Sequence, residues 1–126
     1  HYNPHYAHFL LLTPWPYADI YSAMEPYIEV TDLSRYNLVE PVIRPQSMSR
    51  EEVFSRVLDC YRRFYMWKLP QWVALPDALR RDYLLRSMKE MLQRSFLKGH
   101  GQALGQMPAE VERYLEQLRV DSAGGM

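Results

Sequence analysis

The segment from Ser49 to Trp67 carries the strongest helix signal in the chain, and it fixes much of what the chain can fold into. Ser49 can cap the first free amides of a helix while Glu52 reaches back to it, which is the pattern of a capping box. Apolar and aromatic side chains then recur at spacings of three and four residues, so they predict a helix over about Arg50 to Trp67 with a broad buried face. These side chains are Val53, Val57, Leu58, Tyr61, Phe64 and Tyr65.

A second helix is predicted after a proline-containing turn. Pro70 and Pro76 interrupt the helical pattern between Leu69 and Leu75, because proline has no amide to donate and disfavours the helical conformation before it. The second helix should begin near Pro76 and Asp77 and end at Gly99. Its inner stripe should be formed by Leu84, Leu85, Met88, Met91, Leu92 and Phe96.

The carboxyl-terminal part of the chain predicts a short docking helix. A glycine- and glutamine-rich linker over residues 101–106 precedes an amphipathic helix over residues 107–120, and residues 121–126 form a flexible tail. A helix this short is marginal alone. We therefore expect it to fold back on the domain or to dock on a partner.

The amino-terminal third predicts short strands and turns. The apolar run His8 to Thr13 is typical of a strand covered on both faces, and it stops at the prolines that follow. A short helix over Asp19 to Tyr27 is expected next, and then two strands over Tyr27 to Val30 and Leu38 to Arg44. Pro41 cannot donate to a sheet, so the second strand should be an edge or a broken strand. The predicted fold class is therefore α+β and mostly α, with short amino-terminal strands and turns followed by a two- to three-helix bundle.

Composition limits the partners that the chain can recruit. A chain of 126 residues should form one domain with a modest core. Fifteen acidic residues balance fifteen basic ones, so no overall field favours nucleic acid. The longest uninterrupted apolar run, Phe9 to Leu12, is far shorter than the roughly 20 residues of a membrane-spanning helix. We expect no transmembrane segment and no nucleic-acid partner.

The order of motifs resembles a known enzyme family. The stretch from Tyr36 to Lys68, the LTPWP motif at Leu12–Pro16 and the RRFYM motif at Arg62–Met66 resemble the C-terminal region of cobalamin-dependent radical S-adenosylmethionine enzymes. Within them the likeness is to the anaerobic magnesium-protoporphyrin IX monomethyl ester oxidative cyclases of bacteriochlorophyll synthesis. The resemblance covers roughly residues 9–98, and it implies that residues 1–100 form a cyclase C-terminal-like domain. Pro16, Tyr17 and Ala18 stand where the wider family often continues Pro-Gly-Thr.

The resemblance also implies where the chemistry of such an enzyme would reside. The family holds an iron-sulfur cluster on three cysteines in a CxxxCxxC loop, and this chain has one cysteine, Cys60. The cluster, cobalamin and S-adenosylmethionine are therefore expected only in a full-length family member, and this chain alone should contain no cofactor, metal or catalytic residue. We expect the chain to be cytoplasmic, at most peripheral at the cytoplasmic face of a photosynthetic membrane.

Partner-binding residues are predicted from aromatic and arginine side chains, because these residue types concentrate binding energy at interfaces. The two indoles of Trp67 and Trp72 flank the predicted turn, where they either pack the corner or anchor a partner. Arg62 and Arg63 either form a solvated face paired with nearby carboxylates or bind a carboxylate of a partner or ligand. The predicted partner-binding set is Trp15, Tyr17, Arg62, Arg63, Trp67 and Trp72.

The histidines predict no firm metal site. His100 has no second ligand at helical spacing and is more typical of a solvent-exposed loop residue. His1, His5 and His8 lie in an irregular segment, where at most a weak adventitious cluster could form.

Two classes of function follow. The chain is either the non-catalytic C-terminal domain of a cyclase-like enzyme, working with upstream domains, or a stand-alone structural and interaction subunit of a photosynthetic pigment-protein complex. In both cases the partner is another protein or the missing upstream domains.

Overall fold

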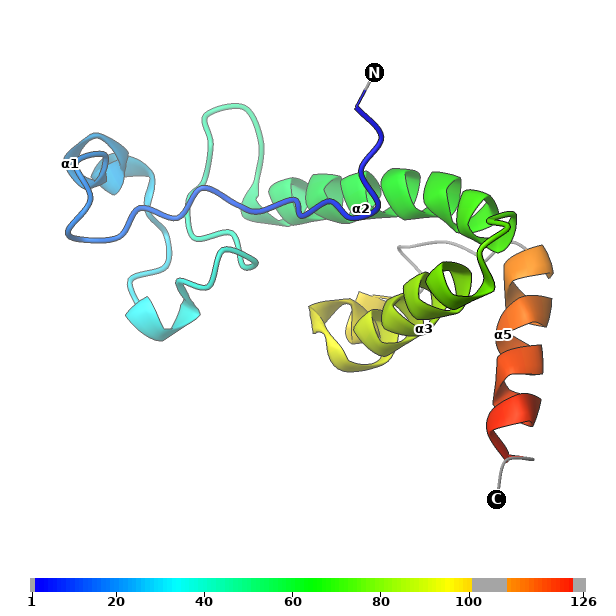
Figure 1. The fold of residues 1–126 in the computed structure, drawn as a ribbon. Coiled ribbons are helices and arrows are strands. Elements are labelled where there is room, and N and C mark those ends of the chain that lie inside the picture. The colour runs from blue at the N-terminus through cyan, green and yellow to red at the C-terminus, as the bar shows by residue number, and fades with distance from the viewer. Residues whose placement is uncertain (1, 101–108, 124–126) are drawn as a thin grey trace. The chain divides into compact units, whose positions relative to one another are not determined.

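The computed structural model describes residues 2–100 and 109–123. The chain divides into two compact units, which are described separately: an amino-terminal unit, His8–Cys60, and a helical unit formed by His1–Ala7 and Tyr61–Met126. The described elements are helices and turns (Figure 1). None of these helices is long and apolar enough to cross a membrane.

The amino-terminal unit contains short helices instead of the predicted strands. They are α1 (Tyr21–Met24), the 3₁₀ helices η1 (Glu25–Tyr27) and η2 (Leu33–Arg35), and the start of α2 (Arg50–Val73). The helix predicted over Asp19 to Tyr27 is therefore present as α1 and η1. The predicted strands over His8 to Thr13, Tyr27 to Val30 and Leu38 to Arg44 are absent from the described residues.

What remains of the two later strands is one antiparallel bridge between Ile28 and Ile43. The amide of Arg44 donates to the carbonyl of Tyr27 at 2.8 Å, and the amides of Glu29 and Val30 both donate to the Val42 carbonyl, at 2.9 and 3.3 Å. The two segments therefore pair where predicted, but the pairing does not extend into a sheet.

Two backbone features explain why the ladder stops. Pro41 has no amide to donate. Leu38 has a φ of 66°, in the left-handed region that a leucine rarely adopts, so the chain cannot stay extended before Pro41. The carbonyl of Leu38 instead accepts the amide of Leu11 at 2.8 Å, which ties the first apolar segment to this turn.

A small core holds the amino-terminal unit together. Val30, Tyr36 and Val42 are buried, and Trp15 and Ile43 pack against them. The Tyr36 hydroxyl donates to the Val30 carbonyl at 2.7 Å, so its polar end is satisfied within the core. Burial of this side chain raises the pKa of Tyr36.

Helix α2 begins at the predicted capping box and ends later than predicted. The Ser49 amide donates to Glu52 Oε2 at 2.7 Å, and the Glu52 amide donates to Ser49 Oγ at 3.2 Å. The predicted end at Trp67 and the turn over residues 69–75 are wrong, because α2 continues through Pro70 to Val73. Pro70 costs one helical hydrogen bond, and burial of the neighbouring aromatic and aliphatic side chains offsets this cost.

The helical unit contains α3 (Ala78–Arg94), the 3₁₀ helix η3 (Phe96–His100) and α5 (Ala109–Ala123). Asp77 caps α3 as predicted, since its carboxylate accepts the Arg80 amide at 3.1 Å. The helix stops before the predicted Gly99, because Ser95 is extended and its hydroxyl accepts the Leu97 amide at 3.1 Å. The predicted linker, residues 101–106, lies outside the described residues, and α5 runs past its predicted end at Val120.

Within the helical unit, side chains from α2, α3 and η3 line one small cavity of about 20 Å³. The two long helices therefore face each other across it. In the inner stripe of α3, Met91 is half-buried, and Phe64 on α2 is also half-buried. The buried apolar and aromatic side chains that the structure describes in this unit are Tyr61, Tyr65, Leu69, Trp72, Leu84, Leu85, Met88, Leu97 and Val111.

Residues 2–7 are bound to the helices of the same unit. The Tyr65 hydroxyl donates to the Ala7 carbonyl at 2.9 Å and accepts the Ala7 amide at 3.2 Å. The Tyr6 hydroxyl lies 2.6 Å from Ser87 Oγ on α3. This segment therefore bridges α2 and α3 by side-chain hydrogen bonds and not by a strand.

Candidate ligand-binding site

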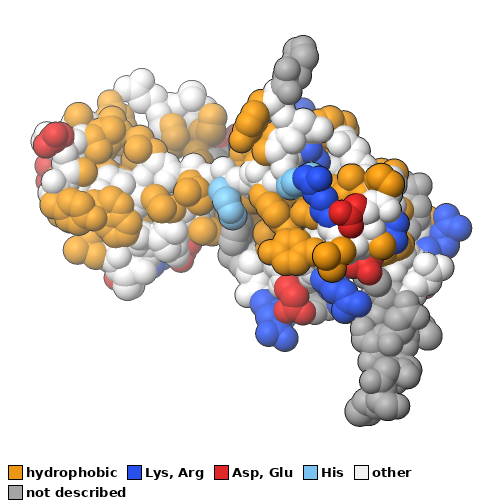
Figure 2. Space-filling view, viewed as in Figure 1, with side chains coloured by type: hydrophobic (Ala, Val, Ile, Leu, Met, Phe, Trp, Pro, Cys, Tyr) orange, Lys and Arg blue, Asp and Glu red, His pale blue; other side chains and the backbone are white. Residues whose placement is uncertain are grey.

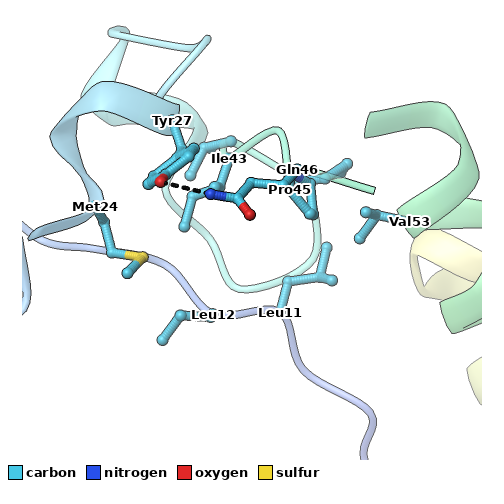
Figure 3. Close-up of a pocket in the computed structure, with 10 residues that line it drawn as sticks. Leu11, Leu12, Met24, Tyr27, Ile43, Pro45, Gln46 and Val53 are labelled. Carbon is cyan, nitrogen blue, oxygen red and sulfur yellow. Dashed lines mark hydrogen bonds between the residues drawn. The ribbon is translucent and has the colours of Figure 1, made fainter. Parts of the chain in front are cut away.

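An apolar cavity of about 340 Å³ lies within the amino-terminal unit (Figure 3). Its walls come from the first apolar segment, from α1 and η1, from residues 41–46 around the Ile28–Ile43 bridge, and from the first turns of α2. No charged side chain is among the residues that line it. The lining residues are Leu11, Leu12, Met24, Tyr27, Pro41, Val42, Ile43, Pro45, Gln46 and Val53.

The local fold explains why this cavity is apolar. The amide of Leu11 is satisfied by the carbonyl of Leu38, so the Leu11 side chain can face the cavity without leaving a backbone donor unpaired. Pro41 and Pro45 have no amide to satisfy at all. Leu12 is 59% exposed, which leaves apolar surface accessible at the edge of the cavity.

One edge of the cavity is polar. Gln46 Nε2 donates to the Tyr27 hydroxyl at 2.9 Å, as the dashed line in Figure 3 shows. Tyr27, Pro45 and Gln46 also line a second cavity of about 290 Å³, together with Pro26, Glu29 and Arg44. The two cavities therefore share a wall.

The second cavity carries charge. Glu29 lies between two guanidinium groups: its Oε1 is 3.8 Å from Arg44 Nη1, and its Oε2 is 3.7 Å from Arg50 Nε. One carboxylate facing two arginines leaves these three groups with a net positive charge. The Arg44 side chain is 66% exposed, so it remains accessible from solvent.

The described residues contain no group of three or more His, Cys, Asp or Glu side chains that could hold a metal ion. Cys60 is exposed on α2. A single cysteine does not fit the three-cysteine cluster site that the family resemblance implies, so no step of chemistry can be derived through such a cluster in this chain.

The predicted partner-binding residues of the amino-terminal unit lie together. Trp15 is half-buried against the core, whereas Tyr17 is 84% exposed. Their rings are stacked, with centroids 6.3 Å apart. In the view of Figure 2, hydrophobic side chains gather on the surface around α1. The other large apolar side chains exposed in this unit are Leu10, Leu12, Ile20 and Leu33.

The two predicted tryptophan anchors of the helical unit have different environments. Trp67 is 57% exposed, whereas Trp72 is 1% exposed. Trp72 packs against Tyr6 and Tyr65, with ring centroids 5.7 and 6.2 Å away. Trp72 is therefore a packing residue, which was the first of its two predicted roles. Of the two indoles, that of Trp67 is the exposed one, and its contact with a partner stays a prediction.

The predicted arginine pair also divides. Arg62 is half-buried and lines the small cavity between α2 and α3, whereas Arg63 is exposed. Both residues interact within the chain. Their pairing with a carboxylate of a partner stays a prediction.

Lys68 is a buried charged residue that sequence reasoning missed. It is 1% exposed, and its ammonium lies 4.9 Å from the centroid of the Trp67 ring and 5.7 Å from that of Phe64. Its hydrogen-bond acceptor is Asn3 Oδ1. Burial lowers the pKa of Lys68. The sequence did contain a signal for this environment, because Lys68 follows Phe64 by four residues and Trp67 by one, and an ammonium is attracted to aromatic faces.

The apolar cavity was missed as well. Its lining residues lie in four separate segments, and the hydrogen bond from the Leu11 amide to the Leu38 carbonyl holds the first of them beside the turn that precedes the third. Pro41 and Pro45, which end the strand pattern, were the local signal for an irregular apolar wall.

Two curated relatives confirm the resemblance to the anaerobic cyclases. An anaerobic magnesium-protoporphyrin IX monomethyl ester cyclase from Rubrivivax gelatinosus is 38% identical over 96 residues, which are 75% of this chain and 17% of that protein. One of the same name from Cereibacter sphaeroides is 36% identical over 93 residues, which are 73% of this chain and 15% of that protein. The chain thus matches about a sixth of the length of these relatives. No protein-family model and no solved structure matches it.

Proposed function

We propose that this chain is a non-catalytic domain of an anaerobic magnesium-protoporphyrin IX monomethyl ester cyclase of bacteriochlorophyll biosynthesis. The observation that carries the proposal is the identity of 36–38% over about three-quarters of the chain with two such cyclases. The domain works with the remaining domains of that enzyme and helps to enclose its tetrapyrrole substrate.

The non-catalytic role rests on the chemistry that the side chains can supply. Cleavage of S-adenosylmethionine by the expected family mechanism needs a cluster held by cysteine thiolates, and this chain offers Cys60 alone. The cluster, cobalamin and S-adenosylmethionine belong to the other domains. The contribution of this chain is an apolar cavity and an exposed aromatic surface.

A chimera tests the proposal. The matching segment of the Rubrivivax gelatinosus cyclase is replaced by this whole chain, so that both compact units stay complete, and cyclase activity is measured anaerobically. We expect the chimera to keep activity and a version lacking the segment to lose it. A soluble, folded chimera that holds its cofactors and has no activity would contradict the proposal.

A second measurement tests the non-catalytic assignment alone. After anaerobic reconstitution with iron and sulfide, the isolated chain should show neither a stoichiometric cluster absorption nor formation of 5′-deoxyadenosine. A stoichiometric cluster with turnover would show that the chain is catalytic.

The alternative function is a stand-alone interaction subunit of a photosynthetic pigment-protein complex, peripheral at the cytoplasmic face of the membrane. The exposed rings of Tyr17 and Trp67 favour it, because aromatic side chains are enriched at interfaces. The intact mass of the native polypeptide distinguishes the two functions. A mass near 15.0 kDa supports the separate subunit, and a polypeptide several times longer supports the enzyme domain.

A further inference from the structure

The apolar cavity and the charged cavity of the amino-terminal unit adjoin each other. Both are lined by Tyr27, Pro45 and Gln46, so the hydrogen-bonded Tyr27–Gln46 pair forms their common wall. On one side of this wall the lining is aliphatic, and on the other side stands the guanidinium of Arg44. Together they make one site that is apolar at one end and cationic at the other.

We propose that these two cavities form one binding site for a porphyrin that carries a single free carboxylate. An apolar edge of the ring occupies the cavity beside Leu12 and Ile43, and the carboxylate faces Arg44. This inference rests on the proposed function, whose substrate is a porphyrin with one carboxylate esterified and one free.

The size of the apolar cavity fits an edge of such a ring. Small-molecule sites typically measure about 300–1,000 Å³ and are lined mainly by apolar side chains with a few polar groups. At about 340 Å³ the cavity is at the lower end of this range, so it encloses part of a macrocycle and leaves the rest for other domains to cover. Leu12, which is 59% exposed, lies where the ring would leave the cavity.

The charge of the second cavity fits a carboxylate. The 3.8 Å separation of Arg44 Nη1 from Glu29 Oε1 is longer than a hydrogen bond, so Arg44 keeps donors for a ligand. Arg50, 3.7 Å from the same carboxylate, offsets the charge of Glu29. A guanidinium can bind a carboxylate through two parallel N–H donors.

A ligand series tests the carboxylate. Magnesium-protoporphyrin IX monomethyl ester and its dimethyl ester, which has no free carboxylate, are titrated into the chain, and quenching of tryptophan fluorescence is measured. We expect the monomethyl ester to bind about fivefold more tightly, which is the upper range for an exposed ion pair. Equal affinity for the two esters would overturn the role of Arg44.

Matched variants test the two ends of the site. Leu12→Gln should weaken binding of both esters about tenfold, because an apolar contact is lost. Leu10→Gln should leave affinity unchanged, since Leu10 is equally exposed at 58% but does not line the cavity. Arg44→Gln should remove the preference for the monomethyl ester and leave dimethyl ester binding unchanged. Arg56→Gln, an exposed arginine outside both cavities, should keep the preference.

The outcomes separate this inference from the proposed function. Either of two results would overturn the site. One is equal porphyrin affinity in all four variants. The other is that oleate displaces the porphyrin equally from the wild type and from Leu12→Gln, because displacement would then not depend on the cavity. Loss of the site together with an active chimera would leave the enzyme-domain function standing. Binding with the expected variant pattern and an inactive chimera would instead support a porphyrin-binding protein outside the cyclase.

Discussion

Lys68 occupies an environment that disfavours its charge. Its ammonium is buried, it faces two aromatic rings, and its hydrogen-bond acceptor is the amide oxygen of Asn3. Aromatic faces and one neutral oxygen replace water only in part, because an ammonium has three donors. Burial accordingly lowers the pKa of Lys68, which means that keeping this residue charged at neutral pH costs folding free energy.

Replacing Lys68 with methionine should stabilise the helical unit. Methionine has a similar length and carries no charge to desolvate, so we expect a gain of about 1 kcal/mol, or roughly 4 °C in the melting temperature. Thermal unfolding followed by circular dichroism measures it. Lys98→Met, at an exposed lysine, serves as the control and should change little. A lower melting temperature for Lys68→Met would mean that the contacts to Asn3 and the rings outweigh the desolvation cost.

His5 gives the helical unit a dependence on pH. Burial, and then the positive charges of Arg80 and Lys68, lower the pKa of His5 below its ordinary 6.5. Below pH 6.5 the unfolded chain therefore binds a proton that the folded chain does not, and folding stability falls as the pH falls. Above pH 6.5 His5 is neutral in both the folded and the unfolded chain, so this loss of stability is absent.

We expect His5→Asn to reduce this dependence. The drop in melting temperature between pH 8 and pH 5 should be smaller in the variant than in the wild type, because the asparagine takes up no proton. His8→Asn, at an exposed histidine, should keep the wild-type drop. The same drop in all three proteins would show that His5 does not control the acid response.

At the scale of the helices, the phase of α2 decides which aromatic residues are buried. Tyr61, Tyr65, Lys68 and Trp72 recur at spacings of three and four residues, so they lie on one stripe of a continuous helix, and all four are buried. Trp67 lies off this stripe and is exposed.

Helix starts were predictable, because the caps at Ser49 and Asp77 depend on local side chains. The end of α2 was not, because packing of distant residues holds the helix through Pro70.

The packing of α3 gives a prediction with an internal control. Leu84 is 3% exposed and Leu79 is 83% exposed on the same helix. Leu84→Ala should lower the free energy of unfolding by about 2–5 kcal/mol, through lost burial and the cavity left behind. Leu79→Ala should change it little, since alanine favours a helix and little burial is lost. Urea unfolding of both variants measures the difference. Equal free energies of unfolding would show that the face of α3 that carries Leu84 is not in the core.

Over the whole chain the net charge is zero, but the charges are unevenly distributed along it. Acidic residues outnumber basic ones in residues 8–60, and basic residues outnumber acidic ones in residues 61–126. The zero net charge excluded an overall electric field, but each unit can still present a local field to a partner.

The sequence also predicted the helices and the relation to the cyclases, because both depend on patterns along the chain. The cavity and the buried Lys68 depend on contacts between separate segments, which such patterns do not contain.

Exposed aromatic residues predict which surface of the chain binds a partner. Trp67 and Tyr17 are the most exposed members of the predicted aromatic anchors, at 57% and 84%, and tryptophan and tyrosine are common binding hot spots. A hot-spot residue changed to alanine costs about 2 kcal/mol or more, which weakens binding roughly thirtyfold. We therefore expect Trp67→Ala to have this effect on binding to a cyclase polypeptide that lacks the matching segment.

Surface-immobilised chain and calorimetry can both measure that affinity. Tyr83→Ala is the matched control, because Tyr83 is 68% exposed on α3 and is not among the predicted anchors. Trp72→Ala would be uninformative here, since removing a buried indole destabilises the fold itself. Thermal melts must show that Trp67→Ala stays folded, because its ring also lies beside Lys68. If Trp67→Ala and Tyr17→Ala both bind as tightly as Tyr83→Ala and the wild type, the predicted anchors are not at the interface with the cyclase polypeptide.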